Sequence, residues 1–98
     1  MTLNEFKELQ KAHRKMVVCF SAEWCGPCRV FAPIFHDVTE KLPEYKFLRF
    51  NVDNCEEICN EYGVQSIPAI LILEGDKVTK ERVGGFGNSA GFIQWVTG

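Results

Sequence analysis

The sequence lacks the features that would indicate a membrane protein or a nucleic-acid-binding protein. Its longest apolar run, residues 67–73, is far too short to span a bilayer. Eleven basic residues nearly balance thirteen acidic ones, so the formal net charge is only −2. No basic surface for nucleic acid or anionic lipid is therefore expected. Without a biased tract, repeat or linker, the 98 residues are expected to form a single domain, residues 1–98.

Targeting signals are missing as well. The first six residues have neither the basic-then-apolar layout of a secretory signal nor the Arg- and Ser-rich composition of a transit peptide. We therefore expect a cytoplasmic protein in a reducing compartment. Five cysteines is an odd number, so a complete disulfide framework would leave one thiol unpaired.

The most informative segment is residues 24–28, with the sequence WCGPC, which lies where a strand should lead into a helix. An apolar, β-branched run (residues 16–20) precedes it, and apolar residues at helical spacing follow it. Cys25 would lie at the positive end of the helix dipole, which favours the thiolate. Cys28 would lie one turn further in, close enough for a disulfide bond. These two cysteines are therefore expected to form a redox-active pair.

Apolar periodicity predicts eight elements in the order α-β-α-β-α-β-β-α. Thr2 and Glu5 have the spacing of a capping box, Asp53 is expected to cap the third helix, and Pro33 should kink the second. The first two strands, joined by a helix, should be parallel, and the last two should form a hairpin. We expect an α/β fold, a central mixed four-stranded sheet with helices on both faces. The helices are predicted over residues 3–13, 28–42, 54–62 and from 88 or 89 onward, and the strands over residues 16–21, 46–52, 69–73 and 78–83.

The remaining cysteines leave alternatives open. Cys55 and Cys59 are four residues apart and share one face of a helix. They are either a buried small apolar residue and an incidental thiol, or a second oxidisable pair that regulates activity. A structural zinc site of Cys25, Cys28, Cys55 and Cys59 is another alternative. The Gly-Pro between the first two favours redox use, because proline restrains the loop where the helix begins, and no metal is expected.

Five parts of the chain form one pattern: residues 22–29 (AEWCGPCR), Pro33, residues 50–53 (FNVD), residues 62–69 (YGVQSIPA) and Val83-Gly84. The pattern resembles the thioredoxin family over about residues 16–97. It matches, in that order, the family's active-site run, its kinking helix proline, the following strand, the segment with the cis-proline and the third substrate-facing loop. Cys-Gly-Pro-Cys followed by a distant Ile-Pro is a highly specific combination.

The resemblance implies a thioredoxin-like fold and a thiol–disulfide oxidoreductase that reduces disulfides in target proteins. Cys25 would be the exposed nucleophile and Cys28 the resolving thiol, and together they would form the redox disulfide Cys25–Cys28. By base rate alone Pro68 would have a trans bond, but the resemblance implies a cis bond. The other expected site residues are an active-site loop and a shallow apolar groove for an extended substrate: Trp24, Gly26, Pro27, Ile67, Pro68, Gly84 and Gly85.

The resemblance also implies partners. An NADPH-dependent thioredoxin reductase would recharge the protein, and the flavin would belong to that partner, so no bound cofactor is expected here. Disulfide-containing proteins, such as peroxiredoxin-like or reductase-like targets, would be the substrates of a monomer. Two alternatives are a binding module with a vestigial cysteine pair, and a disulfide-forming or isomerising enzyme of a secretory compartment.

Two departures from the family pattern bear on the fold and on catalysis. The chain starts directly with a helix, so the N-terminal edge strand of many thioredoxins is expected to be missing. Cys19 stands where the family usually has a buried aspartate. The resemblance implies that this aspartate takes the proton of the second cysteine. We expect Cys19 to be mainly a packing residue. The alternative proton acceptors are Glu23, water or the leaving thiolate, and Arg49 is a weaker candidate for a supporting charge.

Overall fold

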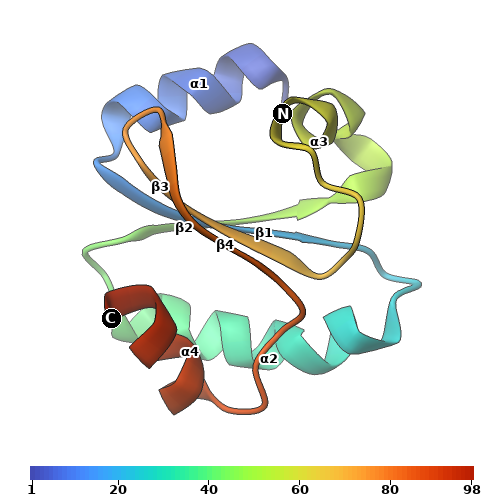
Figure 1. The fold of residues 1–98 in the computed structure, drawn as a ribbon, viewed down its shortest axis with the longest axis vertical. Helices are drawn as coiled ribbons and strands as arrows, with labels where there is room; N and C mark the ends of the chain where they lie inside the picture. The colour runs from blue at the N-terminus through green and yellow to red at the C-terminus, as the bar shows by residue number, and fades with distance from the viewer.

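The computed structural model describes residues 1–98 and contains a mixed sheet with helices on both faces (Figure 1). β1 runs parallel to β2 and antiparallel to β3, and β3 and β4 form an antiparallel hairpin. The predicted α/β fold with a mixed four-stranded sheet is confirmed, and β2 and β4 are its edges. The strands lie in the order β2-β1-β3-β4 and are β1 (Lys15–Ser21), β2 (Lys46–Asn51), β3 (Ala69–Glu74) and β4 (Lys77–Val83).

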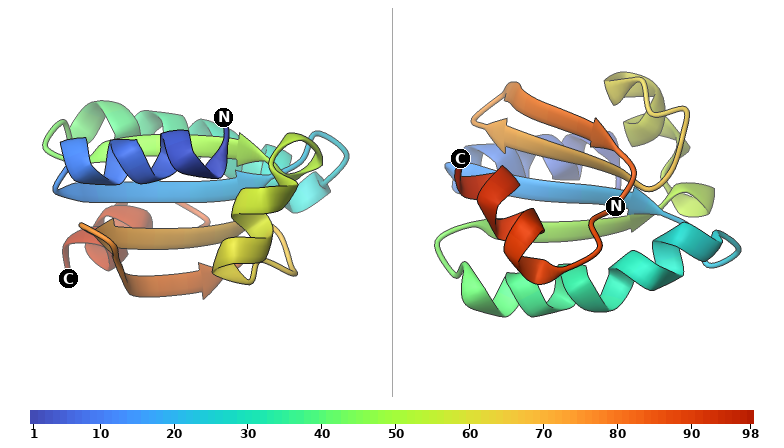
Figure 2. Two further views of the ribbon diagram at one scale, coloured as in Figure 1. Left: turned by 90° about the horizontal axis from the view of Figure 1, so that it is seen from above. Right: turned by 60° about the horizontal axis from the view of Figure 1, so that its bottom comes forward.

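The helices cover the two faces of the sheet in pairs. α1 (Leu3–Ala12) and α3 (Glu56–Tyr62) lie on one face, where a short 3₁₀ turn, η1 (Val52–Asn54), precedes α3 (Figure 1). α2 (Gly26–Lys41) and α4 (Ser89–Thr97) lie against each other on the opposite face (Figure 2). None of these helices combines the length and the apolar character needed to cross a bilayer.

β1 lies at the centre of the core because its side chains alternate between two buried layers. Met16, Val18 and Phe20 pack in the layer of α1 and α3. Val17 and Cys19 pack in the layer of α2 and α4. All five are at most 1% exposed, as expected for an unbroken apolar run buried on both faces. Cys19 is thereby placed in the layer of α2, the helix that carries Cys28.

The capping box predicted at the start of α1 is present. Thr2 Oγ1 accepts a hydrogen bond from the Glu5 backbone N–H at 3.1 Å, and Glu5 Oε1 accepts one from the Thr2 N–H at 2.7 Å. Glu57 of α3 accepts a further bond from the Leu3 N–H at 2.9 Å. The first N–H groups of a helix lack intrahelical partners, so these acceptors stabilise α1 and tie it to α3.

The α3 region differs from the single helix predicted over residues 54–62. The chain first makes η1, whose cap is Asn51, with a side chain that accepts the Asp53 N–H at 2.9 Å. α3 then begins after Cys55, which makes no capping hydrogen bond with its side chain. The prediction that Asp53 caps this helix is wrong, because Asp53 lies within η1 and Cys55 is the N-cap residue of α3. The Asp53 carboxylate instead accepts a hydrogen bond from Trp24 Nε1 at 3.0 Å.

Candidate active site

Cys25 and Cys28 lie at the start of α2, just after the end of β1. Cys25 is the N-cap residue, and its Sγ accepts a hydrogen bond from the Cys28 backbone N–H at 3.3 Å. A serine or aspartate oxygen usually has this role. Gly26 begins the helix and Pro27 follows in its first turn, so α2 starts two residues before the predicted residue 28. Proline fits there because its missing N–H would have had no intrahelical acceptor.

Both cysteines of this pair are buried. Cys25 is 7% exposed and Cys28 is 4% exposed, so the prediction of an exposed Cys25 is wrong. The Cys25 Sγ lies 4.0 Å from the Ile67 carbonyl oxygen, and Ala22, Val52 and Ile67 complete the apolar surroundings. Burial raises the pKa of the Cys28 thiol, and the hydrogen bond with Cys25 adds to the rise.

The loop before β3 lies beside Cys25, and its Ile67–Pro68 peptide bond is cis. The Pro68 carbonyl oxygen accepts a hydrogen bond from the Gly84 N–H at 2.7 Å, which joins this loop to the one after β4. Gly84 has a φ of +102°, a conformation that favours glycine. At Gly85 a Cβ would lie 2.8 Å from the Phe31 Cγ, so only glycine fits without a shift. The start of α2 and these two loops are thereby linked.

Trp24 is a surface residue that a hydrogen bond holds in place. It is 66% exposed, and its Nε1–H donates to the Asp53 carboxylate at 3.0 Å. Val83, just before Gly84, is 67% exposed. Asp53 and Val83 were not predicted as site residues. Their sequence signal was their place in the resemblance, in the segments FNVD (residues 50–53) and Val83-Gly84.

Cys28 borders two different environments. On the interior side lies Cys19, whose thiol has its pKa raised to about 12 by burial, with a contribution from nearby Cys28. The positive charge of Arg49 opposes the rise in pKa at both thiols. A shallow cavity of about 100 Å³ also borders Cys28, and it is lined by Ser21, Ala22, Glu23, Cys28, Arg29, Ala32 and Arg49. The structure therefore places Glu23 and Arg49 at a common cavity with the second cysteine.

Cys55 and Cys59 form a second pair of thiols at the start of α3. Their Sγ atoms are 3.5 Å apart, and the residues are 6% and 8% exposed. Burial raises the pKa of the Cys55 thiol to about 12, and the hydrogen bond with Cys59 adds to the rise. No group of three or more His, Cys, Asp or Glu side chains is arranged to hold a metal ion. The four cysteines of the zinc alternative therefore do not converge.

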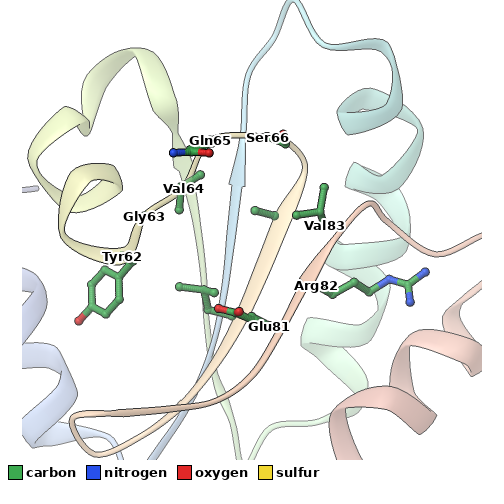
Figure 3. Close-up of a pocket in the computed structure, with 10 residues that line it drawn as sticks. Tyr62, Gly63, Val64, Gln65, Ser66, Glu81, Arg82 and Val83 are labelled. Carbon is green, nitrogen blue, oxygen red and sulfur yellow. The ribbon is translucent and has the colours of Figure 1, made fainter.

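A separate pocket of about 300 Å³ lies between residues 62–66 and the β3–β4 hairpin (Figure 3). Glu81, Arg82 and Val83 of β4 line it, and the guanidinium end of Arg82 points away from Tyr62 (Figure 3). Arg82 donates to the Gly85 carbonyl oxygen at 3.1 Å and lies 4.0 Å from the Phe86 ring centroid. No cysteine lines this pocket, so the reactive site is elsewhere.

A Cys-x-x-Cys pair that begins a helix, follows a central strand and faces a cis-proline defines a protein built for dithiol–disulfide exchange. Comparisons with known proteins agree. The family model described as Thioredoxin matches residues 1–97. The chain belongs to the thioredoxin family and is a thiol–disulfide oxidoreductase.

Individual relatives support this assignment. A thioredoxin of Mycoplasmoides gallisepticum is 36% identical over 80 residues, which are 82% of this chain and 80% of that protein. The structure of Fasciola hepatica thioredoxin is 30% identical, with a TM-score of 0.88 over 98% of this chain and 92% of that chain. A structure from work on a yeast mitochondrial 1-Cys peroxiredoxin and its thiol resolution is 25% identical, with a TM-score of 0.87 over 98% of this chain and 89% of that one.

Proposed function

We propose that residues 1–98 act as one thioredoxin domain that reduces disulfides in target proteins through Cys25 and Cys28. The observation that carries the proposal is the setting of Cys25. Its Sγ accepts the Cys28 N–H at the positive end of the α2 dipole, and it lies against Ile67 beside the cis bond to Pro68. A nucleophilic sulfur and a backbone segment able to bind a target are therefore adjacent.

The reaction consists of two exchange steps. In the first, the Cys25 thiolate attacks one sulfur of the target disulfide, forms a mixed disulfide and releases the other target sulfur as a thiolate. In the second, the Cys28 thiolate attacks the Cys25 Sγ, and the first target sulfur leaves as a thiolate. The protein ends with a Cys25–Cys28 disulfide, and the target gains two electrons, with the protons of the two protein thiols passing through solvent.

Cys28 must lose its proton before the second step. Cys19 is a poor acceptor because its own pKa of about 12 keeps it protonated at neutral pH. Glu23 lines the cavity that borders Cys28, so the proton passes to Glu23, to solvent in that cavity or to the target thiolate released in the first step. The role of Cys19 is then to pack beneath α2.

The target binds in a shallow groove around the first pair. An extended segment of the target pairs with the backbone of Ile67, as peptides do when they add to an exposed strand. Trp24 and Val83 offer exposed apolar side chains beside it. Gly26 and Pro27 complete the active-site loop, and Pro68, Gly84 and Gly85 complete the groove.

Electrons reach the pair from NADPH through a flavin-containing thioredoxin reductase, and the chain itself binds no cofactor. Targets include peroxiredoxin-like and reductase-like proteins. Family membership supports both statements. The yeast relative supports the second, because its structure comes from work on thiol resolution in a 1-Cys peroxiredoxin via glutathione and thioredoxin systems. The protein acts as a monomer in the cytoplasm, with neither nucleic acid nor a membrane as partner.

Insulin reduction tests the proposal, with electrons supplied either by dithiothreitol or by NADPH and a purified thioredoxin reductase. We expect turnover with both donors, and for Cys25→Ser only the uncatalysed rate with either. Turnover with dithiothreitol but none with NADPH and the reductase would contradict recharging by the reductase. No turnover with either donor would favour a binding module.

Equilibration of the Cys25–Cys28 couple with glutathione separates a reductant from a disulfide-forming enzyme. We expect the couple to be more reducing than glutathione, as it is for reducing members of the family. A couple more oxidising than glutathione would assign the protein to disulfide formation.

A further inference from the structure

The exchange reaction leaves Cys55 and Cys59 unused. They are the two thiols outside the layer of α2, and their Sγ atoms are in contact at 3.5 Å. We propose that these two residues form a second redox site, at which a hydroperoxide produces an intramolecular disulfide. Cys55 lies at the junction of η1 and α3, where the backbone is not yet helical, and Cys59 lies within α3.

The geometry needs only a small movement to join the two sulfurs. A disulfide bond is about 2.05 Å long, so the sulfurs must approach by about 1.5 Å. Cys55 has a φ of −140° and a ψ of 44°, outside the helical region, and its side chain makes no capping bond that the movement would break. The backbone bond that joins the two residues directly runs from the Cys59 N–H to the Cys55 carbonyl oxygen and is 3.0 Å long.

The two residues are almost equally buried, at 6% and 8% exposed, but only one of them lines a pocket. Cys59 lines a shallow pocket of about 180 Å³ with Trp24, Val52, Glu56, Val64, Gln65 and Ile67, and Cys55 does not line it. A small oxidant therefore reaches Cys59 first. Burial raises the pKa of the Cys55 thiol to about 12, so it remains protonated until the second step.

The oxidation balances in two steps. The Cys59 sulfur attacks one oxygen of the hydroperoxide, the O–O bond breaks, and the products are a sulfenic acid at Cys59 and an alcohol, or water from hydrogen peroxide. The Cys55 sulfur then attacks the Cys59 sulfur, the S–O bond breaks, and the hydroxide leaves as water with the Cys55 proton. Two thiols and one hydroperoxide give one disulfide, one alcohol and one water.

Intact mass of the full chain carrying Cys25→Ser and Cys28→Ser tests the proposal, because Cys19, Cys55 and Cys59 are then the only thiols. After mild hydrogen peroxide we expect the loss of two hydrogens and, on proteolysis, a peptide linked through Cys55 and Cys59. Adding Cys55→Ser should prevent this loss and leave a sulfenic acid at Cys59 that dimedone labels. Adding Cys59→Ser should abolish both products.

The proposal is overturned if the mass does not change, if the linked peptide contains Cys19, or if dimedone labels Cys55 when Cys59 is absent. Circular dichroism before oxidation shows whether each variant is folded. The unsubstituted protein gives an independent answer. Its expected loss is four hydrogens, from two disulfides, and a loss of only two that maps to Cys25 and Cys28 overturns the proposal.

Discussion

Each of the two cysteine pairs has one cysteine at the N-cap of a helix and one inside that helix, yet the N-cap sulfurs have different partners. Cys25 and Cys55 are both N-cap residues. The Cys25 Sγ accepts the N–H of Cys28, whereas the Cys55 Sγ contacts the Sγ of Cys59. Backbone conformation distinguishes them, because Cys25 has the extended conformation typical of a capping residue (φ −93°, ψ 113°), whereas Cys55 does not (φ −140°, ψ 44°). The Cys55 side chain instead meets that of Cys59, four residues later.

Their surroundings differ as well. The Cys25 sulfur of the first pair lies beside the cis-proline loop, whereas the second pair reaches a shallow pocket through Cys59, and Trp24 and Ile67 also line that pocket. Val52 and Ile67 pack against both clusters and separate them. We expect the docking surface beside the first pair to decide which pair reacts with a protein disulfide.

The largest expected effect comes from removing the thiol that reacts second in each pair, Cys28 or Cys55, and comparing turnover. Cys28→Ser is expected to stop turnover after one event and to accumulate a covalent complex with the target, because the mixed disulfide loses its resolving thiol. Cys55→Ser, the matched control, should keep turning over without a complex. Non-reducing electrophoresis with insulin measures both. A trapped complex with Cys55→Ser would remove the distinction between the pairs.

Cys19→Asp tests how the first pair loses its second proton. We expect the mixed disulfide to resolve faster, by up to about 10²-fold, the lower end of what a placed general base contributes. Cys19→Ser, which supplies no such base, should resolve at the original rate. Rapid mixing of a preformed mixed disulfide measures the rate. An unchanged or slower rate for the aspartate variant would mean that Cys19 does more than pack.

Gly85→Ala disturbs the loops beside the first pair and leaves the second pair intact. The new Cβ would meet Phe31 at 2.8 Å, so overpacking should lower the free energy of unfolding by about 1–3 kcal/mol. Gly87→Ala is the control, since no atom lies within 4 Å of a Cβ there. Urea unfolding compares them. Equal effects would show that the contact with Phe31 is unimportant.

The pH dependence of the free energy of unfolding at alkaline pH compares Cys19, beneath the first pair, with Cys55 of the second. Burial raises the pKa of both thiols from 9.0 to about 12, so the unfolded chain loses these protons before the folded one does. Their contribution to stability is complete below pH 9 and declines as the pH rises toward 12, by at most about 1.4 kcal/mol per pH unit for each group. Cys19→Ala and Cys55→Ala should each make the slope of unfolding free energy against pH shallower. A variant that keeps the original slope identifies a thiol that is not buried.

Trp24→Phe gives the smallest expected change in stability. It removes the hydrogen bond to Asp53, but the side chain is 66% exposed, so we expect a loss of about 1 kcal/mol or less. The KM for insulin should rise more than kcat falls, because the indole offers contact surface. Asp53→Ala is the matched control for the hydrogen bond. A loss of stability as large as that of Gly85→Ala would mean that Trp24 belongs to the core.

Local patterns in the sequence determined the elements and the reactive pair. The capping box of Thr2 and Glu5, the apolar run over residues 16–20 and the Gly-Pro between Cys25 and Cys28 all act between residues close in the chain. They predicted α1, β1 and the start of α2 to within two residues. Such signals survive in a single sequence because the interactions they record span only one or two turns of backbone.

Only the tertiary structure decided which distant groups meet. Cys25 is buried because Ile67, 42 residues away, lies against it, and the Asp53 carboxylate accepts a hydrogen bond from Trp24, 29 residues away. The spacing of Cys55 and Cys59 allowed contact, but the turn at η1 and the packing of α3 on the sheet bring their sulfurs together. Burial and partner choice depend on side chains that arrive from other elements, and these are set when the sheet and its helices assemble.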